Sequence, residues 1–377
     1  MGDAPQPVQL LIMDEEYKEP KPREVSSTIP QRRNYNWWLK ISLYIISLLC
    51  GQSIALILGR LYFVKGGNSK WLATLVQIIG FPVLIPYYFI IKVKKPDPNT
   101  KSPSLLTLSA IYLTFGMLIA ADCYLYTIGL QYLPVSTYTL ICASQLSFNS
   151  FFSYFLNSQK FTPFIINSLV LLTISSVLLV FNNESSDPNG VSRVKYIIGF
   201  VCTVAASAGY GLVMSLTQLC FTKVLKSRTF NIVMGLIIYQ QVVASGAVMV
   251  GLFASGEWRG LGKEMEGYQL GKVSYVMNLV WTAITWQVFT IGCVGLIFEV
   301  TSLFSNAISV LGLPIVPVMA VFVFHDKMDG VKVISMVLAV WGFVSYVYQH
   351  YLDDYKSKEE ENAIQISVSR REMNERL

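Results

Sequence analysis

The sequence predicts an all-α membrane protein with ten transmembrane helices in two inverted five-helix repeats. Its composition, a series of long apolar blocks and a similarity between its two halves support this prediction. The chain has 377 residues, of which 53% are hydrophobic and 14% charged, and its mean hydropathy is +0.49. Soluble domains average about 25% charged residues. Because the apolar residues stand in long blocks rather than in alternating or helical-period patterns, they indicate a polytopic membrane protein.

Each apolar block is long enough for one membrane crossing, since a bilayer core about 30 Å thick needs roughly 20 apolar residues. The link after Leu130 is very short and contains Pro134, which predicts a tight turn between antiparallel helices. The ten predicted spans are residues 39–63, 71–92, 105–130, 133–156, 164–182, 194–221, 230–255, 274–298, 301–324 and 331–352.

The two halves of the chain resemble each other. Residues 155–181 align without gaps with residues 322–348, and Ser168 then meets Ser335. An odd number of helices in each repeat would give the halves opposite orientations, with a substrate site near the membrane midplane between them. The predicted organisation is a disordered tail at 1–37, a first repeat at 38–182, a second repeat at 183–352 and a charged tail at 353–377.

Charge gives a weak indication of orientation and partners. The dense basic cluster after the second block, Lys92 to Lys95, favours both termini in the cytoplasm. The net charge of +6 is spread over loops and tails, so no nucleic-acid partner is indicated. The lipid bilayer is the expected surrounding. The plasma membrane is the default location because no retention signal is evident, and monomer and homodimer both stay open.

Two acidic residues stand where a membrane protein rarely keeps them. Asp122 lies inside the third block, and Glu299 is the only charged residue from Val273 to Phe324. Carboxyl groups at such depth usually face a cavity or a partner, so both are candidates for proton coupling. The structural alternatives are that Asp122 hydrogen-bonds neighbouring helices and that Glu299 caps the ninth helix.

The remaining polar groups point to a neutral, flat solute. Arg60 is essentially the only cation inside the blocks, whereas carriers of phosphate or carboxylate groups need Arg or Lys contacts. Aromatic rings stack on a heterocycle, and Asn or Gln pairs with an adenine-type edge. Other amides at this depth, among them Gln240 and Gln241, are expected mainly to bridge helices. The predicted substrate contacts are Gln52, Tyr124, Gln145, Asn149, Trp281, Gln287 and Asn306.

The sequence gives no sign of an enzyme. The two histidines, His325 and His350, lie near block ends, and the acidic pair in "DKMDG" has no neighbours that would complete a metal site. We therefore expect no catalytic residues, no metal and no cofactor other than a coupling proton.

Several blocks together resemble the plant purine permeases of the drug/metabolite transporter superfamily. They are "GRLYFVKGGNSKWLATLVQIIGFP", "YLPVSTYTLICASQLSFN", "GLFASGEW", "WTAITWQ" and "GLIFEVTSLFSN". The resemblance covers Trp38 to Tyr355 and implies proton-coupled uptake of adenine-like compounds, including cytokinins, by ten helices in two inverted halves. The alternatives are an exchanger or facilitator of other neutral metabolites and a membrane hormone-binding protein that carries nothing.

Overall fold

The computed structural model describes most of the predicted membrane domain. Its contacts divide the chain into residues 1–39 and residues 40–377. Of the first unit it describes only the opening residues of the first helix, so the helix arrangement is that of the second unit. The described residues are 35–92, 104–158, 193–225 and 230–325, with part of 163–174 and part of 329–352.

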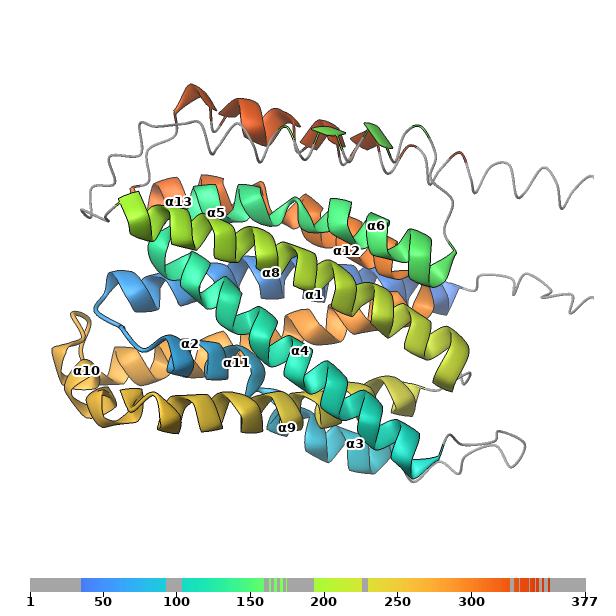
Figure 1. Cartoon of the computed structure of the whole chain (residues 1–377), viewed down its shortest axis with the longest axis horizontal. Coiled ribbons are helices and arrows are strands. Elements are labelled where there is room, and N and C mark those ends of the chain that lie inside the picture. Colours follow the sequence, from blue (N-terminus) through green and yellow to red (C-terminus); the bar gives the residue numbers. More distant parts are fainter. Residues whose placement is uncertain are drawn as a thin grey trace, which may run out of the picture. The chain divides into compact units, whose positions relative to one another are not determined.

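Every regular element among these residues is a helix, as the sequence predicted (Figure 1). The elements before residue 160 are α1 (Tyr35–Val64), α2 (Lys70–Ile78), η1 (Phe81–Leu84), α3 (Ile85–Lys92), α4 (Leu105–Tyr132), α5 (Val135–Cys142) and α6 (Gln145–Asn157). Those after it are α8 (Arg193–Leu219), the π-helix η2 (Cys220–Leu225), α9 (Phe230–Ala254), η3 (Glu257–Gly260), α10 (Leu261–Gly267), α11 (Lys272–Glu299), α12 (Ser302–Gly312) and α13 (Ile315–Phe324).

Six helical segments within the described residues are long and apolar enough to cross a membrane. The first begins close to the predicted start of its block, since α1 opens at Tyr35. The predicted tails and most of the blocks 164–182 and 331–352 lie outside the described residues. The spanning segments are Trp37–Val64, Leu105–Tyr132, Arg193–Leu225, Val233–Ala254, Lys272–Glu299 and Ser302–Phe324.

Three predicted blocks are interrupted instead of forming single continuous α-helices. Pro82 lies at the start of η1, and Pro314 is the residue before α13. Proline lacks the N–H that an uninterrupted helix needs, which explains both breaks. The break at Ala143 and Ser144 has no proline. There the Ser144 N–H donates a hydrogen bond to the carbonyl of Ile141, three residues earlier, at 3.0 Å.

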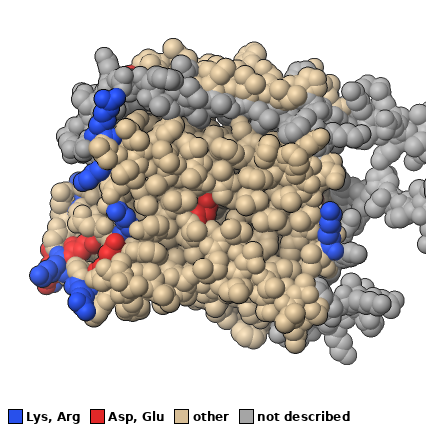
Figure 2. All heavy atoms as spheres, in the orientation of Figure 1, with Lys and Arg blue, Asp and Glu red and all other residues tan. Residues whose placement is uncertain are grey.

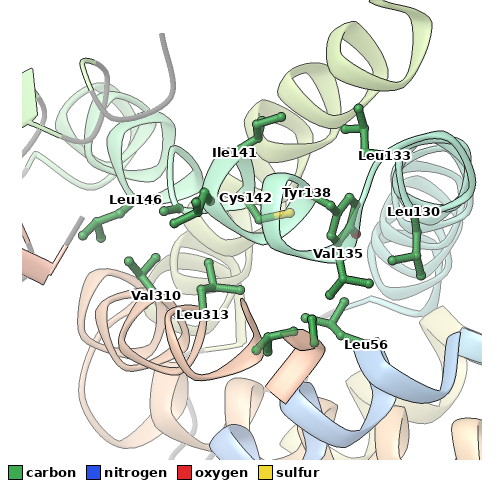
Figure 3. Close-up of a cluster of buried hydrophobic side chains, with 14 of the residues drawn as sticks. Leu56, Leu130, Leu133, Val135, Tyr138, Ile141, Cys142, Leu146, Val310 and Leu313 are labelled. Carbon is green, nitrogen blue, oxygen red and sulfur yellow. The ribbon is translucent and has the colours of Figure 1, made fainter. Parts of the chain in front are cut away.

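Two of the interrupted blocks pack on each other. α5 contacts α13 and α6 contacts α12. Figure 3 shows the apolar cluster that they share: Leu146 from the first block lies near Val310 from the second, and Tyr138, Leu313 and Leu56 of α1 belong to the same cluster. Burial of this cluster holds the breaks of both blocks next to each other.

Glycines allow α1 to lie directly on α11. A β-carbon added at Gly292 would come within 2.6 Å of the Tyr44 carbonyl, and one added at Gly51 within 2.6 Å of the Phe289 nitrogen. Small residues permit such close approach of membrane helices. The face of α11 that carries Gly292 and Gly295 therefore lies against α1.

Two carboxylates attach the segment between α9 and α11 to the corner between α1 and α2. Glu264 accepts hydrogen bonds from the Ser69 N–H at 3.0 Å, from the Tyr275 hydroxyl at 3.0 Å and from Tyr62. Glu257 accepts from the Ser69 hydroxyl at 2.7 Å. Figure 2 shows acidic and basic atoms gathered mainly toward the ends of the helices, with mostly uncharged atoms between.

The loop that follows α10 adds a further polar contact at this end. The Tyr268 hydroxyl accepts a hydrogen bond from the Asn278 amide at 3.3 Å. Burial raises the pKa of Tyr268, while the Asn278 contact lowers it. Tyr268 is therefore a neutral, buried connector between this loop and α11.

Candidate functional site

A cavity lies among the spanning helices. The space open to the centre of a water-sized sphere is about 140 Å³. Its walls come from α1, α2, α4, α5, α6, α8, α9, α11 and α12, so segments from both halves of the chain meet around it. Enclosed, mostly apolar cavities with a few polar groups are the usual form of a small-molecule site.

Amides and aromatic rings dominate the polar and flat surfaces of the cavity. The amides are Gln52, Gln77, Gln145, Gln240 and Gln241, and the rings are Tyr126, Tyr138, Tyr210, Trp286 and Phe289. The centroids of Tyr126 and Tyr210 are 6.5 Å apart, and those of Trp286 and Phe289 are 5.3 Å apart. The cavity therefore offers ring faces for stacking and amide edges for hydrogen bonds.

Asp122 is the one charged residue among the described residues that line the cavity. It is 7% exposed, and its Oδ1 atom has no hydrogen-bond partner within the described part of the chain. A buried carboxylate without a partner is costly, which disfavours the purely structural interpretation in which it bridges neighbouring helices. The geometry instead gives Asp122 an oxygen atom beside the cavity to which no described residue donates a hydrogen bond.

A chain of hydrogen bonds fixes one wall of the cavity. The Gln145 amide donates to the Ser309 hydroxyl at 3.1 Å, and Ser309 donates to the Gln52 Oε1 atom at 3.0 Å. Asn306 lies behind this wall and donates to the Gln145 backbone carbonyl at 3.1 Å. Gln52 and Gln145 thus line the cavity, while the structure places Asn306 outside the lining.

Asn149 lies in a separate polar network that joins α6, α8 and α12. It donates to the Ser302 carbonyl at 3.2 Å and accepts from the Ser215 hydroxyl at 2.7 Å. Gln218 accepts from the Ser302 N–H at 2.9 Å in the same region. Since Asn149 is fully buried and does not line the cavity, its contacts here are those of a helix connector.

On α11 the structure places Trp286, and neither Trp281 nor Gln287, in the cavity wall. Trp286 begins a helical stripe with Phe289, Thr290, Cys293 and Ile297 that lines the cavity. Trp281 is 54% exposed and faces away from the core. Gln287 is 3% exposed, with both amide atoms unpaired among the described residues, and its β-carbon lies near Gly80.

Two more predicted residues lie away from the cavity. Tyr124 stacks on Trp71 with ring centroids 4.3 Å apart. Glu299 is the last residue of α11 and partly exposed. The cap of α12 is Thr301, whose hydroxyl accepts from the Phe304 N–H at 3.1 Å, so Glu299 does not take the capping role that the sequence left open.

The predicted set of substrate contacts did not include Gln240 and Gln241, which line the cavity from α9. In the sequence they stand out only as two adjacent amides at membrane depth. Ile237, Ala244 and Val248 are fully or almost fully buried, and they stand three, four and eight residues from Gln240 on the same face of α9. Polar residues in a buried apolar stripe indicate a polar site next to it.

The spanning helices and the cavity between them define an integral membrane protein of the solute-transporter class. A family model described as purine nucleobase transmembrane transport matches residues 39–356, and the chain belongs to this family. The resemblance found in the sequence is thereby confirmed, and the family consists of transporters rather than enzymes. In the described residues no group of three or more His, Cys, Asp or Glu side chains could hold a metal ion.

Individual relatives extend over nearly the whole chain. "Probable purine permease 10" of Arabidopsis thaliana is 60% identical over 362 residues, which cover 93% of each chain. "Purine permease 21" of the same plant is 58% identical over 365 residues, covering 94% of this chain and 93% of the relative. "Probable purine permease 13" is 45% identical over 348 residues, covering 92% and 96%.

Proposed function

We propose that this chain is a proton-coupled importer of purine nucleobases and related compounds, including adenine and cytokinins, that works by alternating access. The observation that carries the proposal is the cavity itself: one carboxyl, five glutamines and several aromatic rings, with no Lys or Arg among the described lining residues. This set suits a neutral, flat heterocycle with hydrogen-bonding edges. Family membership supports the purine class.

In this proposal Asp122 carries the coupling proton. Removing a carboxyl from water favours its neutral form, so a proton taken from an acidic exterior would keep the group uncharged while the cavity is closed. Coupling requires that protonation changes substrate affinity or the balance of inward and outward states. Glu299, partly exposed at the end of α11, is the second candidate.

The architecture we propose is ten transmembrane helices in two inverted five-helix repeats. α5 begins at Val135 and α12 at Ser302, while α6 ends at Asn157 and α13 at Phe324, so the starts and the ends are both 167 residues apart. Each of these blocks is interrupted. The first part of one contacts the second part of the other, which means that they run antiparallel. This pairing supports an inverted relationship of the halves.

The orientation in the proposal has both termini in the cytoplasm of a plasma-membrane protein. With this orientation the segment between α9 and α11 and the corner between α1 and α2 lie on the outer side. The basic cluster after α3 then lies inside, in agreement with the positive-inside rule. An inward proton gradient would drive the substrate into the cell.

Uptake into proteoliposomes tests the proposed function. Labelled adenine and a labelled cytokinin should each accumulate when an inward proton gradient is applied, and each should compete with the other. Counterflow that ignores the gradient would instead identify an exchanger or facilitator. Saturable binding without flux in either condition would identify a binding protein and contradict the proposal.

A further inference from the structure

We propose that Gln240 and Gln241 of α9, together with Asp122 of α4, form the subsite that hydrogen-bonds the polar edge of the substrate. The inference rests on the proposed function, because it assumes that the cavity holds the purine. It names the residues that recognise the purine edge. These residues lie on α4 and α9, whereas the sequence had predicted Trp281 and Gln287 of α11 as substrate contacts.

The two glutamines face the cavity from the buried side of α9. Each is 4% exposed, while the residues on either side of the pair, Tyr239 and Val242, are 42% and 45% exposed. α9 lies close to α4 at this level, since a β-carbon added at Gly116 would come within 2.9 Å of the Gln240 backbone carbonyl. α4 also carries Asp122, so the three side chains belong to one pair of contacting helices.

These three side chains have hydrogen-bonding capacity left over. The Oε1 atoms of Gln240 and Gln241 and the Oδ1 atom of Asp122 are buried and have no partner among the described residues. Two other cavity glutamines are engaged: Gln77 donates to the Thr127 hydroxyl at 2.8 Å, and Gln145 donates to Ser309. Among the described residues that line the cavity, the buried oxygens without a hydrogen-bond partner are therefore on α4 and α9.

The chemistry of this wall selects a substrate that brings N–H donors. Amide oxygens accept hydrogen bonds, and so does the oxygen of a carboxyl group that bears no proton; an amide also carries an N–H₂ group beside its oxygen. A purine with an exocyclic amino group presents a donor next to a ring acceptor, which an amide pairs in two places. A site with unpaired acceptors discriminates strongly against a ligand that lacks the donor.

A packing role for the two glutamines makes the opposite prediction for stability. Buried amides that help to hold helices together destabilise the protein when they are removed. Buried amides that wait for a ligand cost stability, so their replacement by an apolar group of similar size is neutral or stabilising. The two roles are therefore separable by thermal melting of the ligand-free protein.

The test compares Gln240→Leu and Gln241→Leu with Gln131→Leu in proteoliposomes. Gln131 is a matched control, because its Oε1 atom is also buried and unpaired among the described residues but it does not line the cavity. We expect the half-saturation concentration for adenine to rise about tenfold or more in the two α9 variants. For purine, which lacks the amino group, it should change less than about threefold, and Gln131→Leu should resemble the native protein.

Thermal melting of the purified variants gives the second measurement. Both α9 variants should melt at or above the native temperature without ligand, and adenine should raise their melting temperature less than it raises that of the native protein. The inference is overturned if the variants transport adenine with native half-saturation. It is also overturned if adenine and purine are affected equally, or if the variants melt at a lower temperature with unchanged discrimination.

Failure of the proposed function would look different. In that case the native protein itself would take up neither adenine nor purine, and adenine would not change its melting temperature. Native uptake with unaffected α9 variants would leave the function standing and remove only the assignment of Gln240 and Gln241.

Discussion

The carboxyl group of Asp122 lies directly against Gly209, where an added β-carbon would come within 2.5 Å of the Asp122 Oδ1 atom. The contact joins α4 to α8. Because Gly209 has no side chain, the carboxyl group of Asp122 can occupy the space next to it. Any residue with a β-carbon at position 209 would clash with the Asp122 side chain in its present position.

We therefore predict that Gly209→Ala moves Asp122 and lowers proton-stimulated uptake of adenine by about tenfold or more. The matched control is Gly246→Ala on α9, where an added β-carbon meets nothing within 4 Å. Both changes favour the helix by about 1 kcal/mol, so the control should be as stable as the native protein or more so. Equal uptake by the two variants in proteoliposomes would contradict the prediction.

The tryptophans of α11 give a second prediction. Trp286 lines the cavity and Trp281 is 54% exposed. Trp286→Leu should raise the half-saturation concentration for adenine about tenfold or more, because stacking of a base on an aromatic ring contributes about 1–3 kcal/mol. Trp281→Leu should leave it near the native value. A larger effect at Trp281 would restore the site expected from the sequence.

Ser309 connects Gln145 to Gln52, and its removal takes a hydrogen-bond partner from both amides. Ser309→Ala should destabilise the protein by about 1–3 kcal/mol, seen as a lower melting temperature in detergent. The control is Ser245→Ala, because the Ser245 hydroxyl is buried and has no partner among the described residues. Ser245→Ala should melt at or above the native temperature. If Ser309→Ala melts no lower than Ser245→Ala, the hydrogen bonds of Ser309 do not stabilise the protein.

Glu264 should matter for stability more than an exposed carboxylate nearby. It accepts hydrogen bonds from two tyrosines and from a backbone N–H. Glu264→Gln should cost about 1.5–3 kcal/mol, as expected for hydrogen bonds to a charged group. Glu266→Gln is the control, since Glu266 and its partner Lys272 are 66% and 59% exposed and such a pair contributes little. Indistinguishable melting curves for the two variants would show that the attachment is not stabilising.

The apolar blocks predicted the helices well because their signal is local. Each needs only about 20 residues of high hydropathy, and α4, α9 and α11 begin and end within two residues of their predicted bounds. The breaks at Pro82 and Pro314 have a local cause that the sequence displays. The break at Ala143 was not predictable in this way, because no proline or glycine stands there; the structure shows it next to the contacts of α5 with α13 and of α6 with α12.

The site was harder to predict because it depends on helix rotation. Trp281 and Trp286 differ by five residues and so point in very different directions, and only the packing of Gly292 and Gly295 against α1 decides which one faces inward. Gln240 was recognised as an amide at membrane depth, but only the folded structure shows that its oxygen has no partner in the described part of the chain. Asp122 was easier to place, because a carboxyl group at membrane depth usually faces a cavity or a partner, and it lines the cavity.

The most direct measurement of the central claim is adenine uptake by Asp122→Asn proteoliposomes, with and without an inward proton gradient, beside the native protein and Glu299→Gln. Asparagine keeps the size of the side chain and removes its titration. We predict that native and Glu299→Gln uptake rise when the exterior is acidified, whereas Asp122→Asn shows exchange of adenine that is the same at every pH. Gradient-stimulated accumulation by Asp122→Asn at the native level would contradict the assignment of the coupling proton to Asp122.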